Sequence, residues 1–228
     1  MIKTALVFAA GLGKRMRPLT ESTPKPLIPL AGKPLIVHNI EKLADAGVTD
    51  LVVNTHWLAE QLVAALGDGQ QFGVDIRWSN EKDILDTGGG MKNALPLLGE
   101  NPFIVVNSDV WTDFDFSNLV HQSLPESGAH LIMVPNPEQH KEGDFGIDEY
   151  GLLTMGESGP KYTYAGIGLF SPEFIRTFGT DEPSFPLREA LQAGMACGKV
   201  TAELYQGAWE DVGTPERLEA LEKRIAQP

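Results

Sequence analysis

Residues 2–17 have the sequence IKTALVFAAGLGKRMR, in which an apolar run passes directly into a glycine-rich and cationic segment. The apolar run up to Phe8 predicts a central parallel strand that is covered on both faces. The segment from Ala9 to Pro29 has no apolar period and predicts a long loop, which in a compact domain is usually functional. Ligands of open α/β sheets bind outside the carboxyl ends of the strands, so we expect a ligand site at this loop.

Helix and strand patterns alternate along the rest of the first half. Helices are predicted at 35–46, 58–66 and 88–98, and strands at 51–53, 74–78 and 103–106. Beyond about residue 130 we expect strands at 131–134, 146–155, 165–170 and 200–205, with helices at 186–196 and 215–225. This order predicts an α/β fold with a Rossmann-like, mostly parallel mixed sheet covered by helices on both faces. We expect residues 1–228 to form a single domain.

Composition excludes several classes of protein. The chain has 228 residues, of which 42% are hydrophobic and 21% charged, values that suit a globular protein and not a disordered one. Its formal net charge of −13 argues against a nucleic-acid partner. The single cysteine, Cys197, allows no intramolecular disulfide, which fits a reducing compartment, and we expect it to be buried. No apolar stretch reaches membrane-spanning length, so we expect a cytoplasmic protein with no membrane partner.

The charge is distributed unevenly along the chain. Residues 1–35 contain six lysines and arginines but only one acidic residue, Glu21. A basic island in an acidic protein suggests a site for a small, highly charged anion. Within it, Lys25 lies between Pro24 and Pro26, which restrict the backbone and hold the cation stiffly. The alternative is a rigid surface loop.

The glycine loop differs from two common nucleotide-binding motifs. Glycine N–H groups at Gly11 and Gly13 suit phosphate oxygens, but Met16 stands where a dinucleotide fingerprint needs a third glycine. Asn54 ends the second strand where that fingerprint needs an acidic residue, and the P-loop pattern is absent from the sequence. The remaining interpretation is a different nucleotide loop that combines two glycines with cations.

Acidic residues follow the predicted strands at two distant places. Asp109 comes just after the strand at 103–106, and Asp211 lies in the segment 208–215. If the fold brings them together, two carboxylates and bound phosphates suit Mg²⁺. Asp109 could instead cap the next segment. A third loop, Thr87 to Gly90, would let a base or sugar pack against glycine backbone, or would be a flexible turn.

Together these motifs resemble the sugar-phosphate nucleotidylyltransferase family over almost the whole chain. The matching segments are Ala9-Ala10-Gly11-x-Gly13-x-Arg15-Met16-x-Pro18-Leu19-Thr20, Pro24-Lys25-Pro26-Leu27, Asn107-Ser108-Asp109, Ala165-Gly166-Ile167 and Trp209-x-Asp211-Val212-Gly213-Thr214. The resemblance implies the nucleotide-diphospho-sugar transferase type of fold. It also implies transfer of a nucleotidyl group from a nucleoside triphosphate to a sugar 1-phosphate, with release of pyrophosphate.

The resemblance implies roles for individual residues. The implied catalytic residues are Arg15 on the β and γ phosphates, Lys25 on the reacting phosphates, and Asp109. Mg²⁺ would be held by Asp109 and Asp211. The implied nucleotide-binding residues are Ala9, Ala10, Gly11, Leu12, Gly13, Lys25, Glu81 and Gly88. The implied sugar-binding residues are Asn107, Asp144, Glu157 and Gly166.

The base and the sugar stay open at this level. Glu81 would accept a hydrogen bond from uracil N3–H or from guanine N1–H. Residues 86–90, 110–113, 136–137 and 143–145 are most similar to short uridylyltransferases of cell-wall sugar recycling, which implies UTP as the donor. The alternatives are GTP or dTTP with mannose or glucose 1-phosphate. Ser108 stands where many relatives have glycine, and residues 157–160 replace their Glu-Lys-Pro motif.

Two other classes of function compete with this hypothesis. An NAD-dependent oxidoreductase is disfavoured by the missing third glycine. A non-catalytic nucleotide-sugar sensor is disfavoured because binding alone would not need Lys25, Asp109 and Asp211. The sequence leaves the oligomeric state open.

Overall fold

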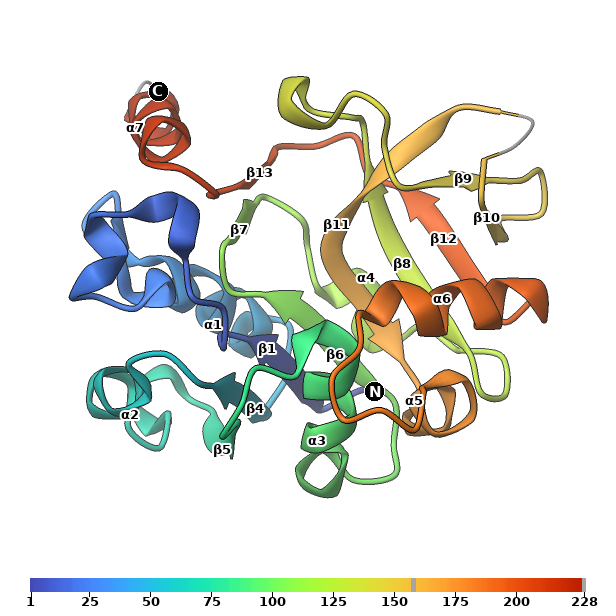
Figure 1. Ribbon diagram of the computed structural model, residues 1–228, viewed down its shortest axis with the longest axis horizontal. Helices are drawn as coiled ribbons and strands as arrows, with labels where there is room; N and C mark the ends of the chain where they lie inside the picture. Colours follow the sequence, from blue (N-terminus) through green and yellow to red (C-terminus); the bar gives the residue numbers. More distant parts are fainter. Residues whose placement is uncertain (157–158, 227–228) are drawn as a thin grey trace.

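The computed structural model describes residues 1–156 and 159–226, and its centre is a nine-stranded mixed sheet (Figure 1). β1 (Thr4–Phe8) lies between β6 (Phe103–Asn107) and β4 (Asp50–Thr55), and β5 (Asp75–Asn80) follows β4. These four strands are parallel neighbours. The predicted parallel centre is therefore confirmed, although β1 begins two residues after Ile2 and the other three strands extend beyond their predicted C-terminal ends by one or two residues.

The other half of the sheet is mostly antiparallel. β11 (Lys161–Phe170) pairs antiparallel with β6 and with β8 (Ala129–Val134), and β12 (Val200–Leu204) pairs parallel with β8. The first residues of β11 also pair with β9 (Phe145–Ile147), which pairs in turn with β10 (Leu153–Thr154). The sheet is thus mixed, as predicted.

Helices cover both faces of the sheet because its strands are apolar on both sides. Ala5 and Val7 of β1 are buried in one core and Leu6 in the other, the alternation that a strand imposes. The first core is covered by α1 (Leu35–Asp45), α2 (Ala59–Leu66) and the short α4 (Ser117–Val120). The second is covered by α3 (Asp86–Leu98), α5 (Pro172–Phe178) and α6 (Leu187–Ala196).

A third, smaller core joins the two ends of the chain. The C-terminal helix α7 (Pro215–Ile225) packs on the segment that follows β1, as the red and blue ribbons show in Figure 1. The buried residues of this core are Met16, Ile28, Leu30, Leu35, Val212 and Leu221. The segment that they anchor contains three short 3-10 turns and the pair β2 (Pro29–Leu30) and β3 (Lys33–Pro34). The predicted loop is therefore compact.

Some elements differ from the sequence predictions. The strand predicted at 146–155 is the hairpin β9–β10, because the Asp148 side chain accepts hydrogen bonds from the Tyr150 and Leu152 N–H groups and turns the chain. Helices α4 and α5 and the ladder between β7 (Val110–Thr112) and β13 (Trp209–Asp211) were not predicted.

Two further expectations concern exposure. The prediction that Cys197 is buried is wrong, because the residue follows α6 as its C-cap and is exposed. Across the described residues, every helix is too short or too polar to cross a membrane.

Candidate functional site

A cleft of about 490 Å³ opens at the carboxyl ends of β1, β4 and β6. It lies where the connections of a parallel sheet leave room for a ligand. The residues that line it are Phe8, Ala9, Ala10, Gly11, Gly13, Lys14, Arg15, Met16, Lys25, Pro26, Asn54, Glu81, Ile84, Asp86, Thr87, Asn107, Ser108, Asp109 and Gly213. They include nine of the predicted site residues.

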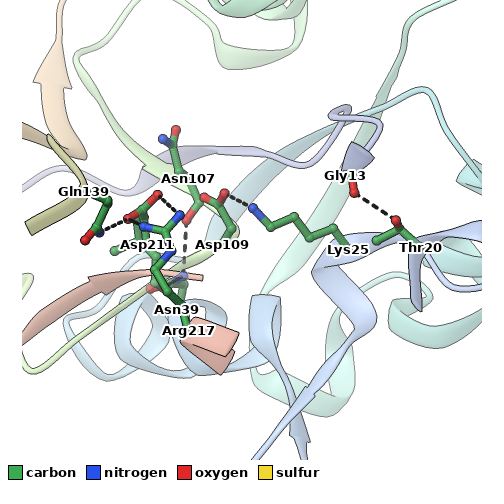
Figure 2. Close-up of polar contacts among 10 residues, drawn as sticks. Gly13, Thr20, Lys25, Asn39, Asn107, Asp109, Gln139, Asp211 and Arg217 are labelled. Atoms are coloured by element: carbon green, nitrogen blue, oxygen red, sulfur yellow. Dashed lines mark hydrogen bonds and ion pairs between the residues drawn. The ribbon is translucent and has the colours of Figure 1, made fainter. Parts of the chain in front are cut away.

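The glycine loop forms one wall of this cleft. Gly13 has a φ of 60°, in the left-handed region that favours glycine, and begins the turn Lys14–Met16. Its carbonyl oxygen accepts a hydrogen bond from Thr20 Oγ1 at 2.8 Å, which folds the segment back on itself (Figure 2). The side chains of Lys14 and Arg15 are exposed at the cleft, where an anion would meet them.

Lys25 crosses the cleft to reach Asp109. It begins the 3-10 turn Lys25–Leu27 between its two prolines, and its ammonium group forms an ion pair with the Asp109 carboxylate (Figure 2). Asp109 follows β6 in a turn whose backbone is held by Asn39 of α1, which donates to the carbonyl oxygens of Asn107 and Val110. The lysine is therefore aimed at the edge of the sheet and not at solvent.

Asp211 joins this group through the β7–β13 ladder. The ladder sets Asp211 opposite Val110, and Val212 N–H donates to the Asp109 carbonyl oxygen at 2.9 Å. Figure 2 shows the two carboxylates as neighbours, with Lys25 at one and Arg217 and Gln139 at the other. Asp211 does not line the cleft itself, although Gly213 does.

The neighbouring carboxylates fit a magnesium ion. Among residues 1–156 and 159–226 no cluster of three or more His, Cys, Asp and Glu side chains forms a closed metal cage. Mg²⁺ does not need one, because it commonly takes one or two carboxylates and completes its shell with water and substrate phosphates. Asp109 and Asp211 are the two carboxylates that could hold such an ion here.

Glu81 lies buried at the opposite wall. Asn54 Nδ2 donates to Glu81 Oε1 at 2.7 Å, and Leu85 N–H donates to Oε2 at 3.3 Å. Burial raises the pKa of the Glu81 carboxyl above its usual value, and these two hydrogen bonds oppose the rise. Asn54 Oδ1 also accepts from Ala9 N–H at 2.6 Å. One amide side chain therefore links the glycine loop to the Glu81 carboxylate.

The remaining predicted residues lie outside the cleft lining. Leu12 is half-buried between two lining glycines, and Gly88 is buried against Phe185 where a Cβ atom would not fit. Gly166 lies against the Asn107 side chain. Asp144 accepts from Tyr164 N–H at 2.9 Å and is close to His140 and Arg188. Glu157 lies outside the described residues.

Sequence reasoning missed three polar residues of the site: Asn54, Gln139 and Arg217. Asn54 argues against a dinucleotide site, but a polar residue directly after the apolar run 51–53 is itself a signal. Arg217 lies in the helix predicted at 215–225, where the pattern does not single out any charged side chain. Gln139 comes from a loop with no distinguishing pattern.

A glycine loop, cations and paired carboxylates at the carboxyl edge of a parallel sheet define an α/β protein built to handle phosphate groups. The chain belongs to the nucleotidyl transferase family, whose model matches residues 4–227.

Two similar relatives share a name. The N-acetylmuramate alpha-1-phosphate uridylyltransferase of Neisseria meningitidis serogroup B is 43% identical over 220 residues, covering 94% of each chain. The protein of that name from Caulobacter vibrioides is 36% identical and covers 99% of this chain and 98% of its own. A crystal structure of a putative glucose-1-phosphate thymidylyltransferase from Bacillus anthracis superposes with a TM-score of 0.86. At 22% identity, covering 100% of this chain and 96% of its own, it shows the fold alone.

Proposed function

We propose that the protein transfers the uridylyl group of UTP to N-acetylmuramate 1-phosphate, forming a UDP-sugar and releasing pyrophosphate. The observation that carries this proposal is the convergence of the glycine loop, Lys25 and Asp109 on one cleft, with Asp211 held beside Asp109 by the β7–β13 ladder. The full-length similarity to two N-acetylmuramate alpha-1-phosphate uridylyltransferases supports the choice of donor and acceptor. UTP is a cytoplasmic metabolite, so we place the reaction in the cytoplasm, in cell-wall sugar recycling.

The reaction is an in-line displacement. An oxygen of the sugar 1-phosphate attacks the α-phosphorus of UTP, the new P–O bond forms, and the bond to the β-phosphate oxygen breaks. Both nucleophile and leaving group are substrate oxygens, so the protein needs to supply position and charge stabilisation and no nucleophile of its own. The cleft is built for those two tasks.

The chain's cations would act on the phosphates. Backbone N–H groups of the glycine loop and the exposed Arg15 would hold the β and γ phosphates. Lys25, already directed across the cleft, would stabilise charge that grows on the reacting phosphates. Bound Mg²⁺, held by Asp109 and Asp211, would neutralise charge at the α-phosphate.

The far wall would read the base. Glu81 Oε1 accepts a hydrogen bond from Asn54 and Oε2 accepts one from Leu85 N–H. A carboxylate can accept about four hydrogen bonds in all. A free site would accept from uracil N3–H. We assign sugar binding to Asn107 at the end of β6, Asp144 just before β9 and Gly166 in β11. Glu157 stays a sugar-binding prediction.

A matrix of substrates tests the proposal. Pyrophosphate release is measured for UTP, dTTP, GTP and ATP against the 1-phosphates of N-acetylmuramate, N-acetylglucosamine, glucose and mannose. We expect the pair of UTP and N-acetylmuramate 1-phosphate to react fastest, and no pyrophosphate release when the sugar phosphate is omitted. A faster rate for mannose or glucose 1-phosphate with GTP or dTTP would show that the enzyme uses those substrates instead. No release from any pair would favour a nucleotide-sugar sensor.

The Asp109→Asn variant tests the proposed role of this carboxylate. It keeps the shape of the side chain and removes its charge, so turnover should fall on the order of 10²-fold or more. The thermal midpoint should change little, since the side chain is 27% exposed. Near-normal turnover at limiting Mg²⁺ would contradict a metal role for Asp109.

A further inference from the structure

The Asp211 carboxylate is occupied by a cation from the C-terminal helix. Arg217, in the first turns of α7, pairs through Nη1 with Oδ1 and through Nη2 with Oδ2, the second bond measuring 3.1 Å. Gln139 Nε2 adds a hydrogen bond to Oδ1 at 3.3 Å. The Arg217 side chain is 16% exposed, so solvent screens this forked pair only partly.

Asp109 is occupied in the same way by Lys25. Each of the two proposed metal ligands therefore carries its own cation, and the four side chains together are neutral. A bare divalent ion that entered between them would have to displace two positive groups. When the metal ion arrives with a triphosphate, the phosphates supply negative charge, and the displaced Lys25 and Arg217 side chains can pair with it.

Arg217 already borders the phosphate side of the cleft. A Cβ atom on Gly213 would lie 1.9 Å from Arg217 Nη2 and 3.4 Å from Arg15 Nη2, so the two guanidinium groups meet over this residue. The backbone of Gly213 is not in the left-handed region, so a side chain here would not strain the backbone. It would instead take the space that the Arg217 guanidinium occupies.

We propose that Arg217 is a positioning residue that exchanges partners: it holds Asp211 while the cleft is empty and turns to the phosphates when the metal and triphosphate enter together. The proposal rests on the proposed function, because it takes Asp211 as a metal ligand. Its consequence is that metal binding and triphosphate binding are coupled, each being weak without the other. Without Arg217 the metal would bind more readily alone and the coupling would shrink.

Mn²⁺ binding, followed by electron paramagnetic resonance with and without UTP, tests this exchange. In Arg217→Gln, Mn²⁺ alone should bind at least about fivefold more tightly, which is the effect of the repulsion between two unit charges about 4 Å apart even in bulk water. UTP affinity should fall, and the ratio of Mn²⁺ affinities with and without UTP should fall with it. Arg217→Lys, which keeps the charge and loses the fork, should lie between the two.

Two further variants separate this exchange from other roles. Arg224→Gln makes the same charge change on the same helix, at a residue that faces Glu210 and Trp111, and should leave Mn²⁺ binding unchanged. Gly213→Ala should displace the guanidinium from Asp211 without removing a charge, and should tighten Mn²⁺ binding in the same direction as Arg217→Gln. It also stands in for that variant if the substitution prevents folding.

The outcomes that overturn the proposal are distinct from failure of the proposed function. If Arg217→Gln weakens Mn²⁺ binding equally with and without UTP, Arg217 is a structural support only, and unchanged binding also refutes the exchange. If the unaltered protein binds no Mn²⁺ even with UTP, the assignment of Asp109 and Asp211 as metal ligands fails first.

Discussion

Asn54 shows how one buried side chain can organise two walls of a site. It is 3% exposed and ends the apolar part of β4, a position where a polar group needs partners. Its oxygen accepts from Ala9 N–H and its nitrogen donates to Glu81, so the glycine loop and the proposed base-reading carboxylate share one anchor. Gly90 of α3 passes so close that a Cβ atom would lie 2.7 Å from Glu81 Oε1.

Replacing Asn54 should therefore affect both binding and stability. Asn54→Ala leaves Ala9 N–H without its acceptor and Glu81 Oε1 without its Asn54 donor, while Oε2 keeps the Leu85 N–H, and this loss should lower the free energy of unfolding by about 1–3 kcal/mol. The KM for UTP should rise more than kcat falls. Urea denaturation and initial rates measure the two effects.

Asn54→Asp is the companion variant. It keeps the acceptor for Ala9 N–H but sets a second carboxylate against Glu81, so one carboxyl of the pair should take up a proton at a higher pH than usual. UTP binding should then improve on acidification in this variant alone. Wild-type KM values in both variants would show that Asn54 does not connect the two walls.

At the scale of elements, β8 carries a buried histidine that makes the fold sensitive to acid. His130 is 5% exposed, its Nδ1 lies 2.9 Å from Thr201 Oγ1 on β12, and Nε2 is 3.9 Å from Glu203. Burial lowers the pKa of His130 from 6.5 to about 4. As pH falls, the unfolded chain therefore takes up this proton before the folded protein does.

The sign of the resulting pH dependence follows directly. The contribution of His130 to stability is fully present above about pH 6.5 and is lost as pH falls toward 4, amounting to about 2 kcal/mol at pH 5. His130→Gln cannot titrate. Between pH 7.5 and pH 5 the wild type should lose about 2 kcal/mol of unfolding free energy relative to this variant, as measured by urea denaturation. A constant difference would refute the assignment.

For the whole molecule, the important contact joins the two ends of the chain. Helix α7 packs its Leu221 side chain, 2% exposed, into the core that also holds Met16 and Ile28 of the segment after β1. The same helix places Arg217 on Asp211. The C-terminal helix thus supports the glycine loop from behind and places a cation at the proposed metal ligand, and we propose that residues 1–228 form one domain.

Leu221→Ala should test this support. Removal of a fully buried leucine side chain should lower the unfolding free energy by about 2–4 kcal/mol and raise the KM for UTP, because Met16 lies between α7 and the cleft. Glu219→Ala on the same helix removes only an exposed pair with Lys223 and should change stability by less than about 0.5 kcal/mol. Equal effects of the two substitutions, read from urea midpoints, would contradict the structural role.

Several features of the fold and site followed from local pattern. The run to Phe8 and the strand at 103–106 predicted the parallel centre, because a strand buried on both faces must be apolar throughout. Lys25, held between prolines, and Asp109, just after a strand, were singled out by position, and the structure brings them into one ion pair. Their catalytic roles stay predictions.

Other features have no local signature. Asp211 meets Asp109 only through the β7–β13 ladder, two three-residue strands whose partners, such as Thr112 and Trp209, are far apart in the chain. Strands this short have little propensity of their own and form because the flanking segments pack.

The amino-acid sequence by itself determined most of the order of elements, the two-sided core and the cationic, glycine-bearing segment, because apolar spacing and backbone restriction act over a few residues. Only the tertiary structure decided which cation faces which carboxylate, and that Asn54 and Arg217 belong to the site. Those contacts join residues that are distant in sequence, and they depend on how sheet, loop and C-terminal helix pack together.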